Sequence, residues 1–383
     1  MQTINKKDNV SLLASFGINT PNISLDDTST ISSLEVVRFV PKRRCVCKAL
    51  WQGKPVYAKI FFGDKAAQYA LRDVRGVESL QKAKILTPKI LKQSNLPQVK
   101  AYVVIFEGIT PSDSAEDVWE SANEFVRIEL AHQLIQVVAQ HHEARLLQTD
   151  MYLKNFLIQY DAIYTIDGDG VRSVDKLSIK KAQANLCQLL SKLDVLTIDS
   201  QLPSLLETYA NARPWQPALD IVAVNKAIEI ARQKATSAYA DKKVFRQCTD
   251  LDVVKTKKVF VAMSAQDAMI DFPQTAAALD AYLNDASLIK NGNTCTVFTA
   301  KMGALDAVIK RYNIKGFWHG FGRAFRRTRA SISWANAHRL QLLGLPTARP
   351  VALVETKWLG LKGKAYFLTE YVDAPDMVQF FAT

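Results

Sequence analysis

The sequence lacks any hydrophobic run long enough to cross a membrane. Its longest apolar stretches, such as Tyr102–Phe106, fall far short of the ~20 residues that a spanning helix needs. The segment Met1–Asn9 has no apolar core, which excludes an ordinary secretory signal. We therefore expect a cytoplasmic protein that is soluble or at most peripheral to a membrane.

Cysteine is scarce, with five residues spread along the chain. Cys45 and Cys47 alternate in a strand-like run and are expected to point to one face, but no second pair completes a zinc site. An odd number of scattered cysteines predicts free thiols in a reducing cytosol.

Acidic side chains are outnumbered by basic ones. The 383 residues contain 49 Lys and Arg against 37 Asp and Glu, a net charge of +12. Such a charge indicates an anionic partner, which could be a nucleic acid, an acidic membrane face or a phosphorylated substrate. Hydrophobic residues make up 48% of the chain, enough for the cores of two or three domains.

What the chain does contain is an ordered series of strand and helix signals. Strand-like runs surround one helical segment in the order Leu34–Val40, Cys45–Trp51, Pro55–Phe61, the helix Gln68–Lys84, and Ala101–Phe106. Helical apolar spacing then covers Asn123–Ala144, Ile179–Leu193 and Ala218–Tyr239.

The first series of signals recurs later in the chain, which predicts an internal repeat. Its second copy comprises strands at Ala286–Lys290, Thr294–Met302 and Ala307–Tyr312, the helix Arg329–Leu343, and the strand Ala365–Thr369. Matched residues are Lys59 with Lys310, Thr87 with Thr347, and Lys100-Ala101-Tyr102 with Lys364-Ala365-Tyr366.

These signals predict an α+β chain in four parts. Residues 1–30 are expected to form a loosely ordered leader and residues 31–107 a small β-rich lobe. Residues 108–240 then form a helical lobe, and residues 241–383 a second, incomplete β-rich lobe.

Lys59 lies in the middle of the apolar strand Tyr57–Phe61, where an unpaired ammonium group would be costly. A lysine that grips nucleotide phosphates and is held by a helix carboxylate would explain it. Glu78, 19 residues later on the predicted helix, is the expected partner. The alternative is an edge-strand lysine that reaches solvent.

Two further motifs carry possible chemistry. In Gln148–Leu157, Asp150 is followed five residues later by Asn155, which is the spacing of a kinase catalytic loop, although Gln148 replaces the usual histidine. Asp167 ends an apolar strand and precedes glycine, as a Mg²⁺-binding aspartate does. Asp169 is more simply an exposed turn residue than a second metal ligand, and surface turns are the alternative for both motifs.

The three motifs occur in the order and on the elements of a protein-kinase-like fold. One departure is the first strand turn, Pro41-Lys42-Arg43-Arg44, which has no glycine. Its basic side chains are candidates to hold phosphate in place of backbone N–H groups. The alternative is a solvated basic turn.

These stretches, together with Val308–Asn313 and Trp334–Val351, resemble the lipopolysaccharide kinase family of bacterial heptose and Kdo kinases. The resemblance implies a protein-kinase-like two-lobe fold followed by a second kinase-like small lobe. It also implies ATP- and Mg²⁺-dependent phosphorylation of a lipopolysaccharide-core sugar at the cytoplasmic face of the inner membrane. The residues implied are Lys59, Glu78 and Glu107 for ATP, Asp150 as base, Lys154 at the transferred phosphate, and Asn155 and Asp167 for Mg²⁺.

The short connection from Asp167 to the predicted helix Ile179–Leu193 favours a glycolipid or other small acceptor over a protein. Basic and aromatic residues between Arg311 and Arg329 suit an anionic glycolipid or bilayer surface, and a nucleic-acid partner is not expected. In the second lobe His338 replaces Glu78 and no base follows, so only the first module is expected to act.

Two other functions stay open. An atypical phosphate loop and Gln148 would also suit a pseudokinase-like scaffold. Another small-molecule kinase, of the aminoglycoside or choline type, would use the same motifs. Nothing in the sequence indicates an oligomeric state.

Overall fold

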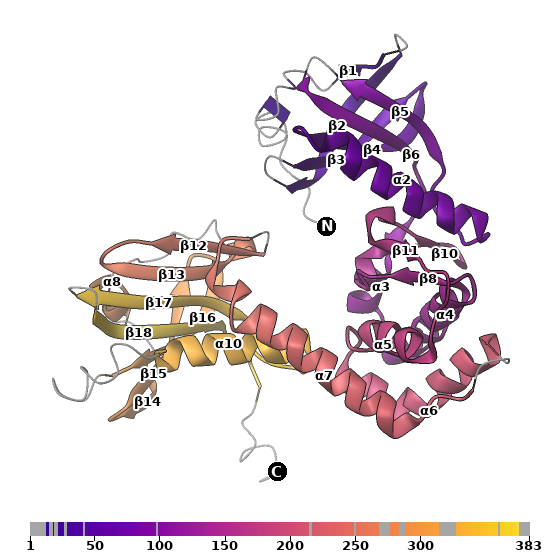
Figure 1. The fold of residues 1–383 in the computed structure, drawn as a ribbon. Coiled ribbons are helices and arrows are strands. Elements are labelled where there is room, and N and C mark those ends of the chain that lie inside the picture. The colour runs from indigo at the N-terminus through magenta and orange to yellow at the C-terminus, as the bar shows by residue number, and fades with distance from the viewer. Residues whose placement is uncertain are drawn as a thin grey trace. The chain divides into compact units, whose positions relative to one another are not determined.

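The computed structural model divides into two compact units, Met1–Leu193 with Thr197–Glu229, and Asp194–Leu196 with Ile230–Thr383. Both contain helices and β-sheet, so the predicted α+β class is confirmed (Figure 1). The residues described are 13–14, 18, 22–26, 29–40, 43–96, 99–213, 217–248, 250–267, 276–282, 288–313, 327–358 and 361–374. Among them, no helix is both long and apolar enough to cross a membrane.

The first unit begins with an antiparallel sheet in the order β1-β2-β3-β4-β6-β5. Its strands are β1 (Ile23–Ser24), β2 (Thr30–Val40), β3 (Arg44–Trp51), β4 (Lys54–Phe62), β5 (Ile90–Leu96) and β6 (Ala101–Glu107). A tight turn with positive φ at Gln52 and Gly53 joins β3 to β4, as the hairpin signal predicted.

One face of this sheet is closed by residues that precede β2. Leu13, Ile18, Ile23 and Leu25 are buried in the same cluster as the inward side chains of the sheet. The prediction of a loosely ordered leader is therefore wrong for these residues. Their apolar side chains are spaced too irregularly for a helix or strand pattern, so only the sheet that they cover reveals their role.

Helix α2 (Ala66–Lys82) covers the other face of the sheet, as Figure 1 shows. Its inward side chains, Ala66, Ala70, Val74 and Val77, pack against Val104 and other residues of the strands. A residue with positive φ at Lys84 ends the helical path. The predicted helix, Gln68–Lys84, is therefore shifted by two residues toward the C-terminus at both ends.

The rest of the first unit is mainly helical and packs around one hydrophobic core. Its helices are α3 (Ala115–Ser121), α4 (Glu124–Glu143), α5 (Ile179–Leu190), α6 (Val195–Ala212) and the beginning of α7 (Ile221–Ala240). Short strands lie between them: β7 (Asp113–Ser114), β8 (Leu146–Gln148), β9 (Phe156–Gln159), β10 (Ala162–Thr165) and β11 (Val171–Ser173). Helix α6 was not predicted.

The second unit contains a seven-stranded antiparallel sheet in the order β12-β13-β17-β18-β16-β15-β14. The strands are β12 (Leu251–Lys255), β13 (Val259–Ser264), β14 (Leu288–Gly292), β15 (Cys295–Met302), β16 (Leu305–Tyr312), β17 (Pro350–Trp358) and β18 (Leu361–Glu370). Helices α8 (Ala276–Ala281) and α10 (Arg329–Leu342) accompany them.

The strand order confirms the predicted repeat. The path β14-β15-β16-α10-β17-β18 follows the path β2-β3-β4-α2-β5-β6, with the same neighbours in the sheet. Lys310 pairs with Val297 and Phe367 on its neighbouring strands, as Lys59 pairs with Val46 and Val104. Strands β12 and β13 extend the second sheet and were not predicted.

One of the predicted residue matches is wrong by one position. Tyr102 packs on the α2 side of its sheet, whereas Tyr366 lies in the cluster on the face opposite α10. Phe367, in the α10-side cluster, pairs with Lys310 as Val104 pairs with Lys59. Counted back from this pair, Tyr102 corresponds to Ala365 and not to Tyr366. Because side chains alternate along a strand, a shift of one residue reverses the face.

Two glycines let α2 approach the 3₁₀ turn η3 (Gly168–Gly170) closely. A Cβ atom built on Gly76 would overlap the carbonyl group of Gly168, and one built on Gly168 would overlap the carbonyl group of Asp73. Glycine inside a helix costs about 1 kcal/mol relative to alanine. Glycine at position 76 therefore lowers the intrinsic stability of α2 but allows the backbone of α2 to contact η3.

We expect Gly76→Ala to lower the free energy of unfolding by about 1–3 kcal/mol, because the added methyl group must push α2 away from η3. Urea unfolding measures this change. Gln81→Ala, at an exposed position of the same helix, is the control and should change stability little. A Gly76→Ala protein as stable as the parent would contradict this close packing.

Candidate active site

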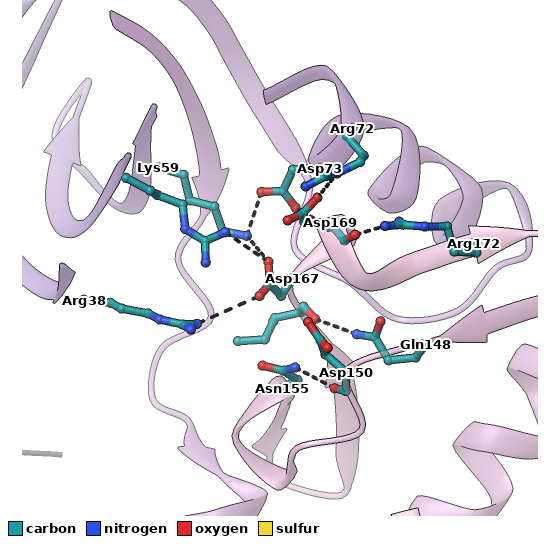
Figure 2. Close-up of polar contacts among 12 residues, drawn as sticks. Arg38, Lys59, Arg72, Asp73, Gln148, Asp150, Asn155, Asp167, Asp169 and Arg172 are labelled. Carbon is teal, nitrogen blue, oxygen red and sulfur yellow. Dashed lines mark hydrogen bonds and ion pairs between the residues drawn. The ribbon is translucent and has the colours of Figure 1, made fainter. Parts of the chain in front are cut away.

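Lys59 on β4 lies between two carboxylates. Its Nζ atom is 2.7 Å from Asp73 Oδ2 and 3.2 Å from Asp167 Oδ1 (Figure 2). Asp73 comes from α2 and is completely buried, whereas Asp167 follows β10. Burial alone would lower the pKa of Lys59, but the two carboxylates more than offset this and raise it. Lys59 is therefore a firmly held cation.

The predicted pairing of Lys59 with Glu78 is wrong, because Asp73 takes that place. Glu78 is exposed. It lies five residues after Asp73 and so about 140° away around the helix. Asp73 falls in phase with the buried residues Ala66, Ala70 and Val77 of α2, and a carboxylate in that phase was the signal that could have identified it.

Asp167 is surrounded by cations. Besides Lys59, Arg44 Nη1 lies 3.6 Å from Oδ1 and Arg38 Nη1 lies 4.0 Å from Oδ2. Burial would raise the pKa of Asp167, but Lys59, Arg44 and Arg38 together lower it to about 2. Its backbone is left-handed, with φ at 67°, a conformation that non-glycine residues rarely adopt and that recurs at functional sites.

The loop with Asp150 and Asn155 lies beside Asp167, as Figure 2 shows. The buried Asn155 donates from Nδ2 to the Asp150 carbonyl oxygen at 2.8 Å. The Ile166 N–H donates to the Asn155 carbonyl oxygen at 2.8 Å. Asp150 itself is exposed. The structure thus gathers Lys59, Asp150, Asn155 and Asp167, while their roles stay predictions.

Gln148 connects the two loops from the other side. Its Nε2 atom donates to the Ile166 carbonyl oxygen at 3.3 Å, so both polar groups of the Ile166 backbone are held. Gln148 is completely buried. The residue that replaces the usual histidine therefore fixes the segment leading into Asp167.

A chain of buried hydrogen bonds leads from the helices to Gln148. Arg213 donates to the Tyr209 hydroxyl at 2.7 Å, which lies 2.7 Å from His142 Nδ1. His142 Nε2 lies 3.1 Å from Asn185 Oδ1, and Asn185 Nδ2 donates to the Gln148 carbonyl oxygen at 2.9 Å. Because the Asn185 amide nitrogen donates onward, neutral His142 carries its proton on Nε2 and accepts from Tyr209. Every donor then points toward the Asp150 loop.

The neighbouring His141 supports the same region separately. Its Nε2 atom lies 3.0 Å from Thr165 Oγ1, just before Asp167. Burial, and to a lesser degree His142, lowers the pKa of His141 to about 3. Burial also lowers the pKa of His142 to about 4, although the hydrogen bond to Asn185 opposes this. The two side chains lie in different directions and are structural, as expected.

Lys154 does not contact the carboxylates of the site in the described structure. Its Nζ atom lies 5.2 Å from the centre of the Tyr152 ring, and Nζ of Lys192, two residues after the end of α5, lies 4.7 Å from the same ring centre. Tyr152 is exposed, two residues after Asp150. Burial and the charge of Lys154 lower the pKa of Lys192. Sequence reasoning missed Lys192 because it is distant in the chain.

The other candidate residues have structural contacts. Glu107 ends β6, and its Oε2 accepts the Lys89 N–H at 3.3 Å. Asp169 donates its N–H to Asp73 Oδ1 at 3.0 Å, and its carboxylate is paired with Arg72. These contacts fit the interpretation of Asp169 as a turn residue, which the sequence favoured over its being a second metal ligand.

The residues present fit a Mg²⁺ ion bound together with phosphates. Mg²⁺ needs only one or two carboxylate or amide ligands when phosphate oxygens complete its shell. Asp167 is ionised and Asn155 is fixed through its amide nitrogen. Elsewhere in the described part of the chain, no three His, Cys, Asp or Glu side chains form a metal cluster. Cys45 and Cys47 are free thiols on one face, with Sγ atoms 3.5 Å apart.

The basic turn contributes Arg44 to the site. Arg43 instead stacks on Tyr69, 4.7 Å from the ring centre. Pro41 and Lys42, which belong to the same predicted phosphate-binding turn, lie outside the described residues. So do residues 314–326, which are most of the basic and aromatic segment predicted between Arg311 and Arg329.

The second unit does not reproduce these charges. Lys310 is exposed, and the helix position that corresponds to Asp73 is Ser333, whose Oγ lies 2.7 Å from the Tyr312 hydroxyl. His338 is buried beside Trp334, with ring centres 4.2 Å apart, and burial lowers its pKa to about 4. The prediction that this lysine lacks a carboxylate partner is consistent with these contacts.

Comparisons with known proteins do not show a family for this chain. No family model matches, and neither does any curated protein. A solved structure described as WaaP in complex with acyl carrier protein shares 16% identity at a TM-score of 0.40, covering 53% of this chain and 88% of that chain. This likeness is too weak to support an argument about function.

We expect Asp73→Asn to lower the free energy of unfolding by about 2–4 kcal/mol, because it removes one carboxylate from a buried ammonium group. Glu78→Gln makes the same chemical change on the same helix and should be neutral, since Glu78 is exposed. Urea unfolding compares the two. A larger loss of stability in Glu78→Gln than in Asp73→Asn would instead support the predicted pairing of Lys59 with Glu78.

The buried histidines predict a stability that falls with acid. Their folded pKa values, about 3 and 4, lie below the unfolded value near 6.5, so the unfolded state binds more protons between these limits. Stability is then complete above pH 6.5 and falls as the pH drops, by about 2 kcal/mol for each histidine between pH 7 and pH 5.

Urea unfolding at pH 7 and pH 5 measures this slope. We expect His142→Gln to be less stable at pH 7 but to lose about 2 kcal/mol of the pH dependence, which is about a third of what His141, His142 and His338 contribute together. His132→Gln is the control, because His132 is only partly buried against Thr208. If the pH dependence of stability were the same in His142→Gln as in the parent, burial would not lower the pKa of His142 as described.

Proposed function

We propose that the first unit is a kinase that transfers phosphate from Mg²⁺–ATP to a sugar hydroxyl of the lipopolysaccharide core or a similar anionic glycolipid. In this proposal residues 31–107 and 108–240 are the two lobes of a protein-kinase-like module, and residues 241–383 are a second, incomplete small lobe. The observation that carries it is the clamp of Lys59 between Asp73 and Asp167, next to Asp150 and Asn155.

Three cations face the proposed phosphate site. Lys59, Arg44 and Arg38 all lie within 4.0 Å of Asp167. They more than neutralise Asp73 and Asp167, the two carboxylates that contact Lys59. The guanidinium group of an arginine can donate two hydrogen bonds to two oxygens of one phosphate group. This supports the idea that basic side chains take over the task of a glycine-rich loop.

Asn155 and Asp167 would hold the Mg²⁺ ion, which neutralises charge on the phosphates when bound. Asp167 has a left-handed backbone, and its carboxylate lies 3.2 Å from Lys59 Nζ. Asn155 is turned toward the proposed metal site by the hydrogen bond to the Asp150 carbonyl oxygen. One loop thus carries both the metal ligand and the proposed base.

Asp150 would accept the proton of the acceptor hydroxyl. Its side chain is exposed, so an acceptor can reach it, while its backbone is fixed by Asn155. A general base of this kind contributes roughly 10²–10⁴-fold to a rate. Lys154, four residues later, would stabilise the transferred phosphate or the acceptor.

The surroundings of Asp150 favour an anionic sugar as the acceptor. Lys154 and Lys192 lie over the exposed Tyr152 ring, two residues after Asp150, which offers two positive charges near the proposed base. Only five residues separate β11 from α5, which leaves little chain to bind a protein substrate. A cytoplasmic protein in peripheral contact with an anionic membrane would meet such an acceptor.

We expect Asp150→Asn to reduce phosphate transfer from Mg²⁺–ATP to core oligosaccharide by about 10²–10⁴-fold, because the base is lost while the fold is kept. Labelled phosphate on the sugar is the measurement. Asp161→Asn, at an exposed turn between β9 and β10, is the matched control and should keep full activity.

The same samples separate the rival functions. Activity of Asp150→Asn equal to that of the parent would refute the proposal. Transfer to an aminoglycoside or to choline, and not to core sugar, would favour another small-molecule kinase. No binding of Mg²⁺–ATP to the folded parent in a calorimetric titration would favour a scaffold.

A further inference from the structure

A groove of about 540 Å³ lies between α2 and β11 in the first unit. Four of its lining residues are cationic, and they are Arg72, Arg75, Lys82 and Arg172. Glu78 is the acidic residue that lines it, so the groove has an excess of three positive charges. A concave surface lined by one sign of charge concentrates ligands of the opposite sign.

This groove is separate from the proposed phosphotransfer site. Arg75 and Lys82 follow Asp73 by two and nine positions, which places them about 200° and 180° around the helix from it. Asp73 faces Lys59, so these two cations face away from the nucleotide side of α2. The nucleotide proposed above would therefore not fill the groove.

The cations of the groove are largely available. Arg75 and Lys82 are exposed, and neither has an ion-pair partner within the described part of the chain. Arg72 uses Nε for the Asp169 carboxylate, and Arg172 uses Nη1 for the carbonyl oxygens of Asp169 and Val171. The remaining nitrogen atoms of both guanidinium groups can donate to a ligand.

We propose that this groove is a second anion site, which binds the phosphate groups of a phosphorylated ligand. Guanidinium groups and an ammonium group from two different elements can surround phosphate oxygens, and arginine does so with paired hydrogen bonds. The Ser173 hydroxyl from β11 adds a further polar group. Binding here does not require that the chain transfers phosphate.

A ligand in the groove would bridge α2 to β11 next to the proposed active site. Figure 2 shows Asp169 between Arg72 and Arg172. Asp169 also donates its N–H to Asp73, the residue that holds Lys59. An anion bound by both arginines would therefore hold in place the turn on which the Lys59 clamp depends.

The test uses inorganic pyrophosphate as the probe and the full chain as the protein. At ten times its dissociation constant, pyrophosphate should raise the melting temperature by about 3 °C or more, at ionic strength matched with sodium chloride. Lys59→Met, which weakens the nucleotide side, should keep this shift. Arg75→Gln with Lys82→Gln should reduce it to what the nucleotide side alone contributes, whereas Lys226→Gln with Lys234→Gln, an equal change of charge on exposed positions of α7, should leave it unchanged.

Vesicles distinguish the source of the phosphate. Cosedimentation with phosphatidylglycerol vesicles, absent with phosphatidylcholine and lost in Arg75→Gln with Lys82→Gln, would indicate a lipid headgroup. A pyrophosphate shift without cosedimentation would indicate a soluble phosphorylated ligand. The proposal is overturned if the Arg75→Gln, Lys82→Gln protein responds like the parent, or if neither probe binds. Each result is independent of the Asp150→Asn activity test.

Discussion

The structure of the first unit depends on a buried ammonium group that must be neutralised. Lys59 extends from the middle of a sheet, and an unpaired charge there would be costly. Asp73 and Asp167 approach it from two elements that are far apart in the sequence. Their convergence requires α2 to touch the turn after Asp167, and Gly76 and Gly168 make that contact possible.

The position of Asp167 is also fixed from the helical side of the unit. The backbone of Ile166 is held by Asn155 at its N–H and by Gln148 at its carbonyl oxygen. Gln148 is in turn held by Asn185, at the end of a chain of buried hydrogen bonds that includes His142. Buried hydrogen bonds of this kind hold side chains in fixed positions, although within the described part of the chain Gln148 Oε1 is buried without a hydrogen-bond partner. The position of Asp167 is therefore fixed both by Lys59 of the sheet and by residues of the helical part of the unit.

Local patterns predicted most of the first unit, and contacts between distant residues explain the errors. Strands β2, β3, β4 and β6, helix α2 and the Asp150–Asn155 spacing follow from periodicity and motif, so they were found, whereas β5 was not. Choosing Glu78 over Asp73 was an error of helical phase, which only the packed face of α2 resolves. The leader, strands β12 and β13, and the register of Tyr366 depend on sheet contacts that no short window of sequence contains.

The second unit shows that this sheet-and-helix topology does not need the charged clamp. It repeats the strand order and the lysine position, yet Lys310 is exposed and Ser333 stands where Asp73 would be. A buried ion pair contributes little net stability, because desolvation offsets most of the attraction between the charges. Stability of the fold therefore does not explain why the first unit keeps Lys59 between Asp73 and Asp167. The proposed role of the clamp in binding phosphate would account for the difference between the two units.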